Sequence, residues 1–354
     1  MLGAIIGDII GSRFELNNTH EIEFELFTEE STFTDDTVLT IAVSNALVYE
    51  TEFAIKIKEY GLKYPNAGYG KLFKNWLFDR DGVKGISYGN GSAMRISSIA
   101  LAFDNLDIVL EKIEESCLIT HGHIDAIRGA KAIGSCIFHA RNNKSKEFIK
   151  TYIEENFQYN LNFTLDSIRE TYKFDSSCNG SVPQSIVAFL ESEDFIHSIK
   201  LAISIGGDSD TIAAMTGSIS EAYYKVISED ILCNCLDKLP LDLKDNLMSF
   251  YIKYPAFLTN KGCEIFKMPI LRAENIVVGL DTGFDIIKKV LIGIIDENGS
   301  KIIYNDGSKS VSAEPYNNRY YEKDAVLIKR ISDNKTFIVI SGGGYIERTT
   351  MCWP

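Results

Sequence analysis

The chain has 354 residues, of which 45% are hydrophobic and 24% charged, a composition typical of a globular protein with a large core and more than one domain. Its formal net charge of −13 argues against an extended nucleic-acid-binding surface, which requires clustered Lys and Arg. The seven Cys form no CxxC pair, and no apolar run approaches membrane-spanning length. We therefore expect reduced thiols in a cytoplasmic protein with no membrane partner.

The first fifteen residues combine a glycine stripe with two carboxylates. Glycine recurs at every fourth position from Gly3 to Gly11, and a helix would place Asp8 and Glu15 on one face. The stripe permits close backbone approach, either to another helix, the commoner use of such a pattern, or to a ligand. Asp8 interrupts an apolar run, and a buried carboxylate needs a partner, which favours a functional role for this segment.

Two acidic turns, each followed by an apolar helical pattern, are the strongest chemical signal. Together they offer the carboxylate and hydroxyl oxygens of Thr34, Asp35, Asp36, Asp208, Asp210 and Thr211. Such hard ligands suit Mg2+ or Mn2+. The first turn alone is equally consistent with a helix cap followed by favourable first-turn acids. The second follows a double glycine and alternates its carboxylates, and the two turns together favour a shared metal site.

Two further segments are candidates for ligand contact. Residues 86–95 form a loop rich in glycine and hydroxyl groups before a helix expected near Met94. Exposed backbone N–H groups in such a loop suit a phosphate or pyrophosphate, although an ordinary tight turn has the same composition. His121 and His123 precede the helical stretch 124–140, and either could cap it or face a site. His121 is the stronger candidate for the site.

The sequence pattern changes from helical to strand-like after Pro269. Before it, helical periodicity dominates, with clear stretches at 104–119, 124–140, 184–203 and 241–253. After it, β-branched runs separated by turn signals lie at 276–278, 290–295, 326–328 and 336–340. We therefore predict a mainly all-α domain over residues 1–268, followed by a small β-rich domain over residues 269–354 whose role the sequence does not assign.

Taken together and in this order, the motifs resemble the ADP-ribosylglycohydrolase family. The resemblance covers most of residues 1–260. It rests on the Gly-Asp-x-x-Gly-x-x-x-Glu start, the two acidic turns, Gly-Asn-Gly-Ser-Ala-Met-Arg at 89–95, Thr-His at 120–121 and Ser-Val-Pro at 181–183. It implies a compact all-α fold with a binuclear Mg2+ or Mn2+ centre, and it does not include the β-rich tail.

The resemblance also implies roles for individual residues. The metal ligands would be the six residues of the acidic turns, Thr34, Asp35, Asp36, Asp208, Asp210 and Thr211. The substrate-binding residues would be Gly89, Asn90, Gly91, Ser92, Met94 and His121, with the loop meeting the diphosphate. Glu15 and Asp36 would be the catalytic carboxylates, with Glu15 acting near the scissile bond as acid or base.

The expected activity is metal-dependent hydrolysis of the glycosidic bond between ADP-ribose and a protein, nucleic acid or small molecule. An oxocarbenium-like transition state would be stabilised by nearby carboxylates. Two alternatives stay open. One is a non-catalytic ADP-ribose binder or crystallin-like structural protein, which the intact ligand set and Glu15 disfavour. The other is a binuclear phosphoesterase, which would release phosphate instead of ADP-ribose.

Overall fold

The computed structural model describes residues 1–78 and 85–254, together with six strand segments between residues 271 and 348. Contacts divide the chain into two compact units, Met1–Phe250 and Tyr251–Pro354. The helical elements in chain order are α1 (Leu2–Gly11), η1 (Ser12–Phe14), α2 (Asp35–Tyr49), α3 (Phe53–Lys63), α4 (Lys71–Phe78), η2 (Asn90–Ser92), α5 (Ser97–Ala102), α6 (Leu106–Cys117), α7 (Ile124–Arg141), α8 (Lys146–Phe157), α9 (Leu165–Ile168), α10 (Cys178–Glu191), α11 (Phe195–Ser204), α12 (Ser209–Tyr224), α13 (Glu229–Asp237) and α14 (Leu241–Lys253).

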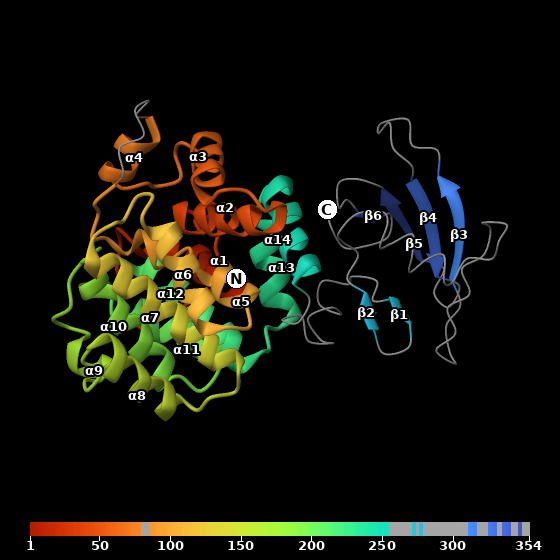
Figure 1. The fold of residues 1–354 in the computed structure, drawn as a ribbon. Coiled ribbons are helices and arrows are strands. Elements are labelled where there is room, and N and C mark those ends of the chain that lie inside the picture. The colour runs from red at the N-terminus through yellow and green to blue at the C-terminus, as the bar shows by residue number, and fades with distance from the viewer. Residues whose placement is uncertain are drawn as a thin grey trace. The chain divides into compact units, whose positions relative to one another are not determined.

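Helices α1 and α12 form the centre of the helical unit (Figure 1). Every residue of α1 is buried. A Cβ atom at Gly3 would lie 2.0 Å from the carbonyl oxygen of Gly217, and one at Gly7 would lie 2.2 Å from that of Ala213. The glycine stripe is therefore a close helix–helix contact, the commoner of the two uses of such a pattern.

The other helices surround this pair. Helices α7, α10 and α11 pack on α12, while α2 packs on α1 and also contacts α3 and α5. Their buried faces are aliphatic and rich in small residues, which brings the helix axes close together. Among the described residues, no helix combines the length and the apolar character needed to cross a membrane.

Two helix predictions need correction. The stretch expected as one helix at 184–203 is two helices, α10 and α11. They separate because the Asp194 side chain accepts a hydrogen bond from the backbone N–H of His197 at 2.8 Å and so caps a new helix. The helix expected near Met94 begins at Ser97. The backbone N–H groups of Ala93 and Met94 both bond to the carbonyl of Asn90, which closes the short turn η2 first.

The second unit contains antiparallel strands. Strands β1 (Leu271–Ala273) and β2 (Ile276–Val278) pair with each other. A four-stranded sheet has the order β3-β4-β5-β6, with bounds Val311–Tyr316, Ala325–Arg330, Lys335–Ile340 and Ile346–Arg348. The β-branched runs at 276–278, 326–328 and 336–340 fall within β2, β4 and β5, and the run at 290–295 lies outside the described residues. An independent domain over 269–354 stays a prediction.

Candidate active site

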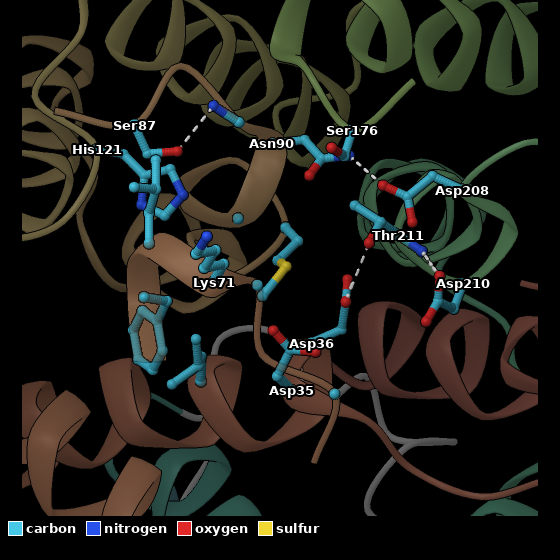
Figure 2. Close-up of a pocket in the computed structure, with 18 of the residues that line it drawn as sticks. Asp35, Asp36, Lys71, Ser87, Asn90, His121, Ser176, Asp208, Asp210 and Thr211 are labelled. Carbon is cyan, nitrogen blue, oxygen red and sulfur yellow. Dashed lines mark hydrogen bonds between the residues drawn. The ribbon is translucent and has the colours of Figure 1, made fainter. Parts of the chain in front are cut away.

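The two acidic turns meet at one cavity. The N-termini of α2 and α12 open onto a hollow of about 450 Å3, and the hydroxyl of Thr211 donates a hydrogen bond to Asp36 Oδ2 at 3.1 Å (Figure 2). The wall includes most of the predicted site residues, namely Glu15, Asp35, Asp36, Gly89, Asn90, Gly91, Met94, His121, Asp208, Asp210 and Thr211. Segments far apart in the sequence thus share one site.

The turn before α12 is shaped by its glycines and held by one asparagine. Gly206 and Gly207 have φ angles of +73° and +77°, in the left-handed region that disfavours other residues. The Asn18 side chain accepts a hydrogen bond from the N–H of Gly207 at 2.9 Å and donates one to its carbonyl at 3.0 Å. This arrangement presents Asp208 and Asp210 to the cavity at the start of α12.

The turn before α2 is held by Asp8. The fully buried Asp8 carboxylate accepts hydrogen bonds from the N–H and hydroxyl of Thr34, at 2.9 and 2.7 Å, and from the N–H and hydroxyl of Thr37. The Thr34 hydroxyl also accepts from the N–H of Asp36 at 3.3 Å, so Thr34 caps α2. Among the described residues of the cavity wall, Thr34 is absent.

Carboxylates from both turns and from α1 are crowded together. One oxygen each of Asp8, Asp36 and Asp210 lie within 4.8 Å of one another, and so do oxygens of Glu15, Asp208 and Asp210. Buried Asp36 Oδ1 has no hydrogen-bond partner among the described residues. A buried polar atom without a partner is costly, and a hard divalent cation is the ligand that an all-oxygen donor set suits best.

The electrostatics of the cluster also favour a bound cation. Burial, together with the charge of Asp8, raises the pKa of Asp35 to about 8. Burial raises the pKa of Asp36 and Asp210 well above the usual range, with further contributions from neighbouring carboxylates. These shifts describe the cluster without metal, and a cation among the oxygens would restore the ionised forms. The residues present therefore fit the expected metal.

The glycine-rich loop is fixed by pairing with two other segments. The Ser87 N–H donates to the carbonyl of Thr120 at 3.4 Å, and the Asn90 N–H donates to the carbonyl of Ser176 at 2.8 Å. The Asn90 side chain donates to Asp208 Oδ2 at 2.7 Å, which ties the loop to the second acidic turn. Ser92 is buried with its hydroxyl directed at the carbonyl of Ala126, and it is absent from the described cavity wall.

The two histidines take different places. His121 is buried at the cavity wall, and burial, reinforced by the charge of Arg95, lowers its pKa to about 3. His123 caps α7 by accepting a hydrogen bond from the N–H of Asp125 at 3.2 Å. Of the roles left open for this pair, His123 has the capping role and His121 faces the site.

Several cavity residues, among them Lys71 and Phe174, did not emerge from the sequence, and Tyr88 was predicted only as part of the 86–95 loop. Lys71 at the start of α4 lies on the opposite side of the cavity from Asp208 and Asp210 (Figure 2), and the exposed rings of Tyr88 and Phe174 also line the wall. The two glycines that precede Lys71, at positions 68 and 70, were a signal for its neighbourhood. No pattern around Phe174 sets it apart from an ordinary loop aromatic.

Comparisons with known proteins agree with this architecture. The family model for ADP-ribosylglycohydrolase matches residues 1–253. ADP-ribosylhydrolase ARH3 from Homo sapiens is 27% identical over 307 residues, covering 63% of this chain and 84% of that protein. A putative ADP-ribosyl glycohydrolase of Acanthamoeba polyphaga mimivirus is 24% identical over 296 residues, covering 66% of this chain and 90% of that protein.

A solved structure supports the fold. It is described as an ADP-ribosylglycohydrolase-related protein complex, superposes with a TM-score of 0.54 at 19% sequence identity, and covers 71% of this chain and 94% of its own. The likeness concerns the fold alone. Because the family model spans most of the chain, the protein belongs to the ADP-ribosylglycohydrolase family.

Proposed function

We propose that this protein is a metal-dependent hydrolase that cleaves the N- or O-glycosidic bond between ADP-ribose and a modified target. The observation that carries the proposal is the convergence of buried Asp8 with Asp36 and Asp210, the latter two in the wall of a cavity that also contains a glycine-rich loop. The loop suits a diphosphate, and the carboxylates suit cations that would stand beside the ribose. Family membership supports this assignment.

Two Mg2+ or Mn2+ ions would be held by Asp35, Asp36, Asp208, Asp210 and Thr211. Bound there, such ions supply Lewis-acid polarisation of hydroxyl and water oxygens. Thr34, whose hydroxyl is directed at Asp8, would contribute by holding the first turn in place.

Glu15 is the group placed to move a proton. Its side chain lines the cavity, and burial, reinforced by the charge of Asp208, raises its pKa above the ordinary value. A carboxyl group with a raised pKa exchanges protons more readily near neutral pH. Cleavage requires a proton to leave the attacking water and one to reach the leaving group, and Glu15 would serve one or both of these transfers.

The test is release of ADP-ribose by the purified full chain. Substrates carrying ADP-ribose on arginine, serine, a nucleobase or an acetyl group would be incubated with Mg2+, Mn2+ or EDTA. We expect metal-dependent release from at least one substrate, and the panel identifies the linkage. Release of phosphate would indicate a phosphoesterase, and tight ADP-ribose binding without turnover would indicate a non-catalytic binder.

A pair of aspartate variants makes the test specific to the site. Asp210→Asn removes a buried charge from the cluster and should lower both metal affinity and turnover by more than about 100-fold. Asp166→Asn is the matched control, because Asp166 is exposed and pairs with Arg169 at the surface. Equal activity of the two variants would contradict the proposed metal site.

A further inference from the structure

A hydrogen-bonded chain of three buried residues ends at the cavity wall. One terminal nitrogen of the Arg95 guanidinium contacts the hydroxyl oxygen of Thr120 at 3.0 Å, and that oxygen contacts His121 Nδ1 at 2.7 Å. Arg95 is completely inaccessible to solvent, and Thr120 and His121 are buried. The same nitrogen of Arg95 also donates to the carbonyl of Ser116 at 2.9 Å, which anchors the start of the chain.

The direction of these hydrogen bonds follows from the chemistry of the groups. A guanidinium has only donors, so the Thr120 oxygen must accept from Arg95. The Thr120 hydroxyl proton then needs an acceptor, and within the described part of the chain the atom in contact is His121 Nδ1. If the oxygen instead accepted from both groups, its buried proton would have no acceptor among the described residues, which is costly. Donation to Nδ1, which then carries no proton, is therefore the favoured arrangement. A neutral imidazole has one N–H group, which must then be at Nε2.

The opposite nitrogen of the ring lies against the glycine-rich loop. A Cβ atom placed on Gly91 would lie 2.9 Å from His121 Nε2, and one on Gly89 would lie 3.8 Å from it. Both glycines and His121 line the cavity. Glycine at these positions leaves room beside the Nε2–H group, where an oxygen atom of a ligand can approach it.

We propose that Arg95 and Thr120 are positioning residues that fix His121 as the neutral Nε2–H tautomer, so that it donates a hydrogen bond to a diphosphate oxygen held by the glycine-rich loop. The identity of this oxygen rests on the proposed function, whereas the tautomer does not. The opposite tautomer would present a lone pair at Nε2 and repel an anion. The nearby Arg95 cation also opposes a doubly protonated ring, in agreement with the lowered pKa of His121.

The tautomer can be read directly by NMR. In full-length protein labelled with 15N-histidine, the two ring nitrogens of a neutral histidine differ strongly in chemical shift according to which one carries the proton. His121→Gln assigns the signal. We expect the wild type to show protonated Nε2 and unprotonated Nδ1, unchanged between about pH 5 and pH 8 because the group stays neutral.

Thr120→Val and Thr120→Ser separate positioning from packing. The valine variant keeps the size of the side chain but removes the hydroxyl, so we expect mixed tautomers. ADP-ribose binding should weaken by about two- to tenfold, in proportion to the loss of the Nε2–H population. The serine variant keeps the hydroxyl and should restore both the tautomer and the affinity. Thermal unfolding confirms that each variant is folded at the temperature of the measurement.

Specific results would overturn the inference. A wild-type ring protonated at Nδ1, or at both nitrogens near neutral pH, would refute the hydrogen-bond direction. Retention of the Nε2–H tautomer in Thr120→Val would show that the relay does not set it. Because the spectrum needs no substrate, absence of turnover would refute the proposed hydrolysis while the spectrum still decides on the tautomer.

Discussion

Replacing Gly7 by alanine tests whether the contact between α1 and α12 holds the acidic cluster together. The new Cβ would lie 2.2 Å from the carbonyl oxygen of Ala213 and 2.4 Å from its carbonyl carbon. These are backbone atoms within a helix, so no side chain can move aside. The two backbones must separate by about 1 Å or more to reach ordinary contact distances.

Both the free energy of unfolding and the metal affinity should respond. Overpacking of a close contact costs about 1 to 3 kcal/mol, and a backbone–backbone clash lies at the upper end or beyond. Asp8 follows Gly7 on α1, and Asp210 is in the first turn of α12, so separating the helices also separates two members of the carboxylate cluster. We expect Mn2+ affinity to fall by about 10- to 100-fold, the usual range for displaced metal surroundings.

Urea denaturation and calorimetric titration with Mn2+ would measure these effects. Gly70→Ala is the matched control, since among the described residues no atom other than those of its chain neighbours lies within 4 Å of a Cβ at that position. It should change the unfolding free energy by less than about 1 kcal/mol. Wild-type stability and Mn2+ affinity in Gly7→Ala would refute the argument that this glycine contact aligns the two halves of the site.

Three further substitutions have distinct expected outcomes. Glu15→Gln should leave Mn2+ affinity near the wild-type value but lower kcat about 100-fold or more, because it removes the cavity-wall group that we propose moves a proton. Lys71→Gln should raise KM for ADP-ribosylated substrates about fivefold at low salt, since Lys71 is an exposed cation in the cavity wall and makes no ion pair with another described residue. Asp245→Asn should stabilise the protein by about 1 kcal/mol at pH 7.5, because burial, reinforced by a neighbouring carboxylate, raises the pKa of Asp245 to about 6 and penalises its charged form in the fold.

Each of these predictions has a contradicting result. A wild-type kcat for Glu15→Gln would remove its catalytic role. Lys74 is exposed on the same helix but is absent from the described cavity wall. If Lys74→Gln raised KM equally, the effect of Lys71 would be only a general change in charge. The Asp245→Asn gain should be full above about pH 6 and vanish below about pH 4, where the carboxyl is protonated in both states; a gain independent of pH would refute the electrostatic origin.

The acidic turns could be predicted from sequence because their chemistry is local. The run Thr34-Asp35-Asp36 places a hydroxyl and two carboxylates within three residues. The double glycine before Asp208 indicates a turn that can adopt positive φ angles. The φ angles at Gly206 and Gly207 are left-handed, which accounts for glycine at both positions. The helical content of the first 250 residues could also be predicted, because apolar periodicity is a local property of the sequence.

Other parts of the site depend on tertiary contacts that no short motif encodes. Lys71 enters the wall because α4 follows a glycine-rich bend, and its sequence neighbours resemble those of any amphipathic helix. The link from Arg95 to His121 joins residues 26 positions apart through Thr120, and only the fold shows that the guanidinium is buried. The break between α10 and α11 lies at the polar run Glu191-Ser192-Glu193-Asp194, which is equally compatible with the exposed face of one continuous helix until the Asp194 cap is seen.

Asp8 shows why structural and chemical interpretations of one residue need not compete. Its four hydrogen bonds to Thr34 and Thr37 fix the start of α2, which is a structural role. One of its oxygens also lies within 4.8 Å of oxygens of Asp36 and Asp210, which adds charge to the cluster. The capping of α2 and the clustering of carboxylates are thus consequences of the same contact. A helix N-terminus held by a buried carboxylate presents its first-turn acids in one direction, and in this fold that direction is the cavity.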